Sequence, residues 1–318
     1  HRRRAPRGGP AGGRAVSAGA RAGAPVRASA IGAILLLLAG TFLLTLMGAL
    51  IKLLGDRFSS TELAAWRNLF GMIPTGLILL LARDWRARGR PLRLRRWRLA
   101  LMRGVFVTFA QLAYYLALTR LEFATAATLL FTGPMFVTAI SAVLLGSPVG
   151  AWRWGAVATG FAGCAMILRP GSDAFTLAAL LPLCAACGYA LTSTTSKLID
   201  AEAPTALINL YSAVSALVGA VILALVTGGF TRPGSLEELG LLMAMAVSGG
   251  TGVVFLIMAY RLTSPAVVAP FEYFGLLYAV GLGWLLFGEA PLETLFPGAL
   301  AIVAAGLVIA WRERRRPA

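Results

Sequence analysis

The chain has 318 residues, of which 58% are hydrophobic and 13% are charged, and its formal net charge is +16. Together with a mean hydropathy of +0.79, this composition excludes an ordinary soluble globular domain. In a soluble protein so large a positive charge would suggest nucleic acid as the partner. Here the cations follow the layout of the apolar segments, so we expect no nucleic-acid partner.

In chain order, residues 1–30 come first and are rich in Arg, Gly, Ala and Pro without an acid, which predicts a disordered basic tail. Ten stretches that follow are apolar enough to cross a bilayer, which takes about 20 residues of helix. We therefore predict an all-α integral membrane protein with ten transmembrane helices and a short tail at 312–318. The predicted spans are 31–54, 61–82, 99–119, 123–145, 151–168, 175–197, 205–227, 239–260, 265–287 and 294–311.

Basic residues mark the two sides of the predicted membrane. With ten spans, twenty-two of the 29 Lys and Arg residues fall on one face, in both tails, in the loop from Arg83 to Arg98 and in shorter loops. The opposite face has only Arg57, Arg120, Arg169 and Arg232. The positive-inside rule therefore predicts a multi-pass protein of the cell inner membrane with both termini in the cytoplasm.

The two sets of five spans resemble each other. Arg120 and Arg261 lie 141 residues apart, each followed by Leu and then by a span with an internal proline, Pro134 or Pro270. Because five is odd, a second copy enters the membrane from the opposite side, and such inverted repeats are typical of secondary transporters. The five-helix repeats that we infer span residues 31–169 and 174–311.

Several short motifs resemble the EamA family of the drug/metabolite transporter (DMT) superfamily, over residues 31–311. They are Lys52-Leu-Leu-Gly-Asp-Arg-Phe-Ser-Ser, Leu63-Ala-Ala-Trp-Arg67, Tyr114-Tyr-Leu-Ala-Leu118 and Phe287-Gly-Glu289. The family usually has Gly-Glu after its fourth span too, where this chain has Gly146-Ser147. The run Pro270-Phe-Glu-Tyr273 is similar to the branch containing S-adenosylmethionine and riboflavin carriers. The resemblance implies a ten-helix transporter of small organic molecules.

Four charged side chains fall inside predicted spans, where each costs about 2.5–3.5 kcal/mol on insertion scales. Lys52 lies near the outer end of the first span, within snorkelling reach of the interface. Arg67 suits either helix packing or a substrate carboxylate, and Arg103 suits either a lipid headgroup or the substrate. Glu272 is the only carboxylate well inside a span, so we expect it to pair with one of these arginines or to bind substrate or a proton.

Aromatic and amide side chains at similar depths are candidates for the wall of a substrate cavity. Gln111 and Tyr115 are four residues apart and share one face of the third span. Tyr189 lies in the sixth span, Tyr211 in the seventh and Tyr273 in the ninth. Aromatic walls with a few polar groups suit a flat or amphipathic solute, although each residue also suits ordinary helix packing.

Together these features predict a secondary transporter that moves a small organic metabolite by alternating access. An amino-acid or drug exporter of the same superfamily is the alternative. A membrane-embedded enzyme is the rival class, but the single histidine is His1, which leaves only Ser193 or Ser196 with Lys197 as a formal catalytic dyad.

No cofactor or metal is expected, because the chain lacks a nucleotide-binding Gly-rich loop and we interpret Cys184 and Cys187 as packing residues. The expected partners are the small-molecule substrate and membrane lipid, with a proton as candidate coupling ion and a monomer or homodimer as the assembly. The cargo, the direction of transport and the coupling stay open at this point.

Overall fold

The computed structural model describes residues 24–81, 89, 92–144, 150–169, 176–196, 198–199, 205–263, 265–289 and 292–314. Every regular element in these ranges is a helix. The first half contains α1 (Ala24–Leu54), α2 (Ser60–Leu81), α4 (Trp97–Leu118), α5 (Phe123–Leu130), α6 (Gly133–Leu144) and α7 (Ala151–Leu168). The second half contains η1 (Leu177–Leu180), α8 (Leu181–Ser196), α9 (Thr205–Thr227), α10 (Leu236–Leu262), α11 (Pro265–Glu272), α12 (Phe274–Phe287), α13 (Leu292–Leu295) and α14 (Gly298–Arg314).

Each predicted span coincides with one helix or with two consecutive helices. Among the described residues, eight segments are long and apolar enough to cross a membrane. α7 is not one of them, and the apolar stretch of α14 is confined to Gly298–Ile309. The first helix begins at Ala24, inside the predicted tail, while residues 1–23 and 315–318 lie outside the described ranges.

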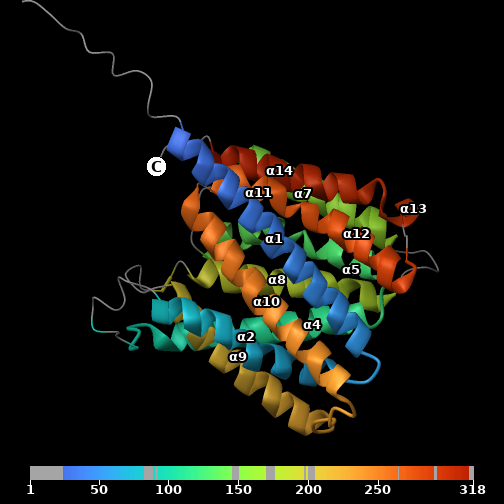
Figure 1. Ribbon diagram of the computed structural model, residues 1–318. Helices are drawn as coiled ribbons and strands as arrows, with labels where there is room; N and C mark the ends of the chain where they lie inside the picture. The colour runs from blue at the N-terminus through green and yellow to red at the C-terminus, as the bar shows by residue number, and fades with distance from the viewer. Residues whose placement is uncertain are drawn as a thin grey trace, which may run out of the picture.

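Helices of the first half pack against helices of the second half (Figure 1). The principal contacts have counterparts in which the equivalent helices of the two halves change places. α1 packs along α10, and α4 packs along α8 in the same way. α2 contacts α10 while α9 contacts α4, and α1 lies against α11 and α12 while α8 lies against α5 and α6. The pairs α2–α9 and α7–α14 lie at opposite sides of the bundle (Figure 1).

The start of α1 and the end of α14 lie at the same end of the bundle (Figure 1). We call this the tail end. The opposite end holds the turn between α1 and α2, the turn between α4 and α5, and the segment after α12, and we call it the turn end.

The fourth and ninth predicted spans are each broken into two helices, which the sequence analysis did not anticipate. α5 and α11 both contain eight residues. The first break falls at Phe131 and Thr132, just before Pro134, and the second at Tyr273, three residues after Pro270. Proline lacks the N–H that would bond to the carbonyl four residues earlier, so Pro134 removes a helical bond to Leu130 at the first break. The second break lies on the C-terminal side of Pro270, so the missing N–H of that proline does not account for it. The ring centroids of Phe131 and Tyr273 lie 5.7 Å apart, so the two breaks meet.

Close helix contacts at two places require glycine. A Cβ on Gly40 of α1 would lie 2.9 Å from the carbonyl oxygen of Gly252 on α10, and a Cβ on Gly252 would lie 2.9 Å from the carbonyl oxygen of Gly40. In the same way, a Cβ on Gly163 of α7 would lie too close to the carbonyl oxygen of Gly298 on α14, and a Cβ on Gly298 too close to that of Gly163. Such small residues let backbones of membrane helices approach each other, which here joins the two halves.

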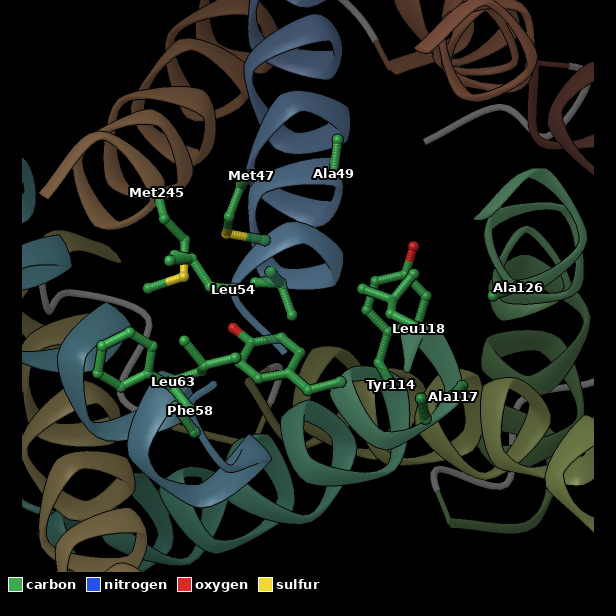
Figure 2. Packing of buried hydrophobic residues seen from close by; sticks show 14 of the residues in the cluster. Met47, Ala49, Leu54, Phe58, Leu63, Tyr114, Ala117, Leu118, Ala126 and Met245 are labelled. Atoms are coloured by element: carbon green, nitrogen blue, oxygen red, sulfur yellow. The ribbon is translucent and has the colours of Figure 1, made fainter. Parts of the chain in front are cut away.

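The largest buried cluster lies where α1, α2, α4 and α10 meet (Figure 2). Met47 of α1, Met245 of α10 and Leu63 of α2 lie on one side of α1 in this cluster (Figure 2). Tyr114 and Leu118 of α4 lie on the other side. Because methionine has no branches and a polarizable sulfur, it fills irregular gaps and tolerates rearrangement. The candidate site adjoins this cluster.

Candidate functional site

Arg67 is a charged side chain of α2 that lies against α10 of the other half. It is the eighth residue of α2, about 10 Å along the helix from its first residue. Its Nε lies 3.6 Å from the position that a Cβ on Gly249 of α10 would occupy. Its Nη1 donates a hydrogen bond to the side-chain oxygen of Asn68 at 3.2 Å, and its Nε is buried without a hydrogen-bond partner.

The neighbouring Asn68 forms a reciprocal amide pair with Gln111 of α4. Asn68 Nδ2 donates to Gln111 Oε1 at 2.8 Å, and Gln111 Nε2 donates to Asn68 Oδ1 at 3.1 Å. Both side chains are 1% exposed. The pair ties α2 to α4 and holds Asn68 Oδ1 toward Arg67. The sequence analysis selected Gln111 but missed Asn68, although an amide next to Arg67 in an apolar helix was an available signal.

Two tyrosines from different halves complete this group. Tyr115 of α4 is 1% exposed, and its hydroxyl has no hydrogen-bond partner in the described part of the chain. Tyr189 of α8 packs against the same buried cluster. Tyr115 lies one helical turn from Gln111, the partner of Asn68, so the tyrosines and the amide pair next to Arg67 belong to one region of the bundle. We call Arg67, Asn68, Gln111, Tyr115 and Tyr189 the Arg67 group.

Arg103 lies elsewhere and has partners of its own. The residue is 6% exposed, so its side chain is not at a lipid headgroup as one expectation had it. Its Nε donates to the carbonyl oxygen of Thr192 on α8 at 2.9 Å, and its Nη1 donates to the hydroxyl of Ser212 on α9 at 3.2 Å. These bonds let Arg103 join three helices.

Tyr211 is also separate from the Arg67 group. Its hydroxyl donates to the carbonyl oxygen of Leu92 at 2.8 Å, which attaches α9 to the segment before α4. Tyr211 therefore lies next to the chain ahead of α4, whereas Gln111 and Tyr115 lie in the second half of α4.

Glu272 and Tyr273 lie at the break between α11 and α12. The hydroxyl of Tyr260 on α10 donates a hydrogen bond to Glu272 Oε1. The ion pairs recorded for the described residues do not include Glu272, so the expected pairing with Arg67 or Arg103 does not occur there. The hydroxyl of Tyr273 is buried without a hydrogen-bond partner among the described residues, and its ring fills the space beside Gly306 of α14.

At the turn end, Lys52 is held by an ion pair rather than extended to the interface. Its Nζ lies 2.5 Å from Glu289 Oε1 and donates to the carbonyl oxygen of Leu121 at 2.8 Å. The other carboxylate oxygen of Glu289 accepts a hydrogen bond from the backbone N–H of Phe123, the first residue of α5, at 2.7 Å. Glu289 thus binds a lysine and a helix N-terminus together.

Further contacts join the turns of the two halves at the same end. Arg57 Nε lies 2.8 Å from Glu238 Oε1. Glu62 accepts hydrogen bonds from the backbone N–H groups of Ser59 and Thr231, the first at 2.7 Å. The turn after α1 is therefore attached both to the segment after α9 and, through Lys52, to the segment after α12.

No three His, Cys, Asp or Glu side chains gather into a metal site within the part of the chain that the structure describes. Cys184 and Cys187 on α8 are free thiols, the first exposed and the second partly buried. Ser196 Oγ donates to the carbonyl oxygen of Ser193, and Lys197 lies outside the described residues.

Comparisons with known proteins agree on one family. The EamA-like transporter family matches the chain twice, over residues 31–169 and 176–311. A riboflavin transporter of Rhizobium johnstonii is 34% identical over 69% of this chain and 72% of its own length. The pseudopaline exporter CntI of Pseudomonas aeruginosa is 29% identical over 87% of this chain and 95% of that protein.

An S-adenosylmethionine uptake transporter of Rickettsia conorii is 25% identical over 87% of this chain and 93% of that protein. One solved crystal structure has the same fold, with a TM-score of 0.57 and 18% sequence identity over 91% of this chain and 97% of the other. The family match confirms the resemblance seen in the sequence motifs. The chain belongs to the EamA-like transporter family of the DMT superfamily and is a small-molecule transporter of the membrane.

Proposed function

We propose that the protein is an inner-membrane carrier that moves a small organic metabolite by alternating access. In this proposal ten spans form two inverted repeats, at 31–169 and 174–311, with both termini and the Arg83–Arg98 loop in the cytoplasm. The tail end of the bundle then faces the cytoplasm and the turn end faces the outside. The distribution of arginines supports this orientation.

Packing supports the inverted repeats. Exchange of the halves maps the α1–α10 contact onto α8–α4 and the α2–α10 contact onto α9–α4. It also maps α5 onto α11, two helices of eight residues that both precede a break. Two arrangements of nearly equal energy are expected from such exchangeable halves, which is what alternating access requires.

The Arg67 group is the substrate site in this proposal. The observation that carries it is a partly buried arginine among helices of both halves, whose buried Nε has no partner among the described residues. Arg67 is linked through Asn68 to Gln111, one helical turn from Tyr115, and the Tyr115 hydroxyl is likewise buried without a partner in the described chain. A substrate held there contacts both halves, so binding and rearrangement are coupled. Arg103 and Tyr211 serve helix packing, because their polar atoms already have protein partners.

Glu272 and Tyr273 act beside the substrate site rather than in it. The contact of Tyr273 with Phe131 lies where the two broken helices meet, so we assign these residues to the movement of the halves. Glu272 is in addition the candidate proton site, because no described cation is paired with it.

Counterflow in proteoliposomes tests the carrier mechanism. Riboflavin and S-adenosylmethionine are suitable probes, since the names of two relatives give these molecules as their cargo. A carrier shows saturable uptake that is accelerated by the same unlabelled solute inside the vesicles. Flux that rises linearly with probe concentration, without counterflow, would identify a channel instead.

Tyr115→Phe tests the site within the same assay. Loss of one hydroxyl that bonds the substrate is expected to raise the half-saturation concentration about tenfold. Tyr211→Phe is the matched control, because it removes a hydroxyl that bonds only to the protein among the described residues. Equal effects of the two substitutions would count against the proposed site.

A further inference from the structure

Arg67 differs from Lys52 and Arg103 in what surrounds it. Lys52 bonds to Glu289 and to a backbone carbonyl, and Arg103 bonds to Thr192 and Ser212. Arg67 has one hydrogen bond, at 3.2 Å, to an oxygen that already accepts from Gln111. An arginine has five N–H donors, so most of its bonding capacity is unused.

The buried and partly buried carboxylates of the bundle, within the described ranges, are engaged elsewhere. Glu62 binds two backbone N–H groups, Glu289 binds Lys52, and Glu272 accepts from Tyr260. The ion pairs of the described residues join other cations, so Arg67 has no protein counter-ion there. The Arg67 side chain is partly buried, but its Nε is fully buried without an acceptor in the described chain. A buried donor left unsatisfied costs free energy, so the site lacks an acceptor as it stands.

The groups around Arg67 specify what would complete it. The hydroxyl of Tyr115 is a buried donor without a partner in the described chain, and Tyr189 packs against the same buried cluster. A carboxylate or phosphate accepts from a guanidinium fork and from a hydroxyl at the same time. A neutral or cationic group would leave the guanidinium charge uncompensated.

We propose that Arg67, with the Tyr115 hydroxyl, binds an anionic group of the transported molecule, which is therefore a small organic carboxylate or phosphate. This inference rests on the proposed carrier function and adds the chemical class of its substrate. Asn68 and Gln111 are positioning residues, because their mutual bonds hold the amide oxygen that orients Arg67.

A matched pair of fragments tests the charge preference without knowledge of the substrate. Benzoate and benzamide have the same shape but differ in charge. Thermal unfolding of the purified protein is followed while each is titrated, because a ligand of the native state raises the Tm by mass action. We expect the wild type to bind benzoate at least about tenfold more tightly than benzamide, as one charge-assisted pair provides.

Two variants assign the preference to this site. Arg67→Met is expected to abolish the preference and to leave the Tm of the empty protein unchanged or raised, because it removes an uncompensated charge. Arg103→Met is the control and is expected to lower the Tm, because Arg103 bonds to α8 and α9. Tyr115→Phe keeps the packing and should weaken benzoate binding while leaving benzamide binding unchanged.

The outcomes separate this inference from the carrier function. Saturable counterflow of either probe with equal binding of benzoate and benzamide overturns the anion site and leaves the carrier intact. A benzoate preference that depends on Arg67, without counterflow, retains the anion site and overturns the carrier. If phosphatidylglycerol stabilises the protein and benzoate does not compete with it, the bound anion is a lipid and the inference is overturned. The inference is also overturned if ligand-free Arg67→Met has a Tm as far below that of the wild type as Arg103→Met has, because Arg67 would then be a structural residue.

Discussion

At the scale of residues, the polar side chains of the candidate site differ in how many of their hydrogen-bonding groups have protein partners. Arg103 and Glu289 satisfy backbone and side-chain groups of other helices, whereas Arg67 leaves donors unused. Buried polar groups without partners cost free energy, so unused capacity indicates a ligand more directly than polarity alone. Residue type could not distinguish Arg67 from Arg103 in the sequence, because both are arginines in apolar helices.

The amide pair gives a residue-scale prediction about stability. Gln111→Leu is expected to destabilise the protein by about 1–3 kcal/mol, because it leaves the amide of Asn68 buried without its partner. Thermal unfolding in detergent measures the loss.

The double substitution Asn68→Leu with Gln111→Leu controls for packing, since it removes both polar groups at once. It should cost less than the sum of the two single changes. Additive losses would mean that the amides do not depend on each other.

Glu272 provides a second prediction at this scale. Glu272 accepts a hydrogen bond from Tyr260 and forms no ion pair with a described cation, so it can take up a proton without breaking an ion pair. We predict that Glu272→Gln abolishes uptake driven by a pH gradient but retains counterflow, since shape is kept and titration is lost.

Vesicles with an imposed pH gradient provide the measurement for Glu272, and Glu293→Gln at an exposed position of α13 is the control. Wild-type uptake that does not respond to the gradient would rule out the proton role. A collapse in folded yield for Glu272→Gln alone would make Glu272 a structural residue.

At the scale of elements, the turn end is held together by contacts between helices that are far apart in the sequence. Glu289 joins the end of α1, the start of α5 and the end of α12 through Lys52 and Phe123. The motif Phe287-Gly-Glu289 was noticed in the sequence as a family feature without a role. Its role could not be predicted, because its partners lie 237 and 166 residues away.

Glu289→Gln is therefore predicted to loosen the turn end. It weakens the attraction for Lys52 and leaves that cation partly buried. A cysteine placed at Leu121 should react about tenfold faster with an impermeant maleimide. The reason is that the form with an open turn end is stabilised by about 1.4 kcal/mol relative to the closed form, which raises its population about tenfold. The native thiols are first replaced by Ala, at Cys164, Cys184 and Cys187.

Glu238→Gln is the control for the Glu289 experiment. It breaks the ion pair with Arg57, whose side chain is 49% exposed, and exposed pairs contribute little. If both substitutions accelerate labelling equally, the Lys52–Glu289 contact has no special role in closing this end.

At the scale of the whole molecule, the main feature is that helices of the two halves are interleaved. The principal contacts of α1 with α10, of α2 with α9 and α10, and of α4 with α8 and α9 cross between halves, so neither half forms a separate domain. A rearrangement must therefore slide helices past one another. The reciprocal close contacts of Gly40 with Gly252 bring the backbones of α1 and α10 together along one such boundary between the halves.

The orientation in the membrane is the prediction at this scale. Alkaline phosphatase fused after Arg98 or after Ala318 is expected to be inactive, because both points are predicted to be cytoplasmic, and fused after Gly171 it is expected to be active. Enzyme activity in whole cells measures the side. The reverse pattern would contradict the proposed inverted repeats.

By itself, the sequence determined the helical membrane class, the positions of the apolar helices and the family, because these depend on local composition and on motif order along the chain. Only the tertiary structure decided which charges have partners: Lys52 with Glu289, Arg103 with α8 and α9, Glu272 with Tyr260, and Arg67 with an amide alone. The helix breaks at Phe131 and Tyr273 also emerged only there, although Pro134 and Pro270 were visible. The physical reason is that hydropathy acts over about 20 neighbouring residues. Hydrogen bonds and ion pairs act over about 3 Å between atoms whose approach depends on how all the helices pack.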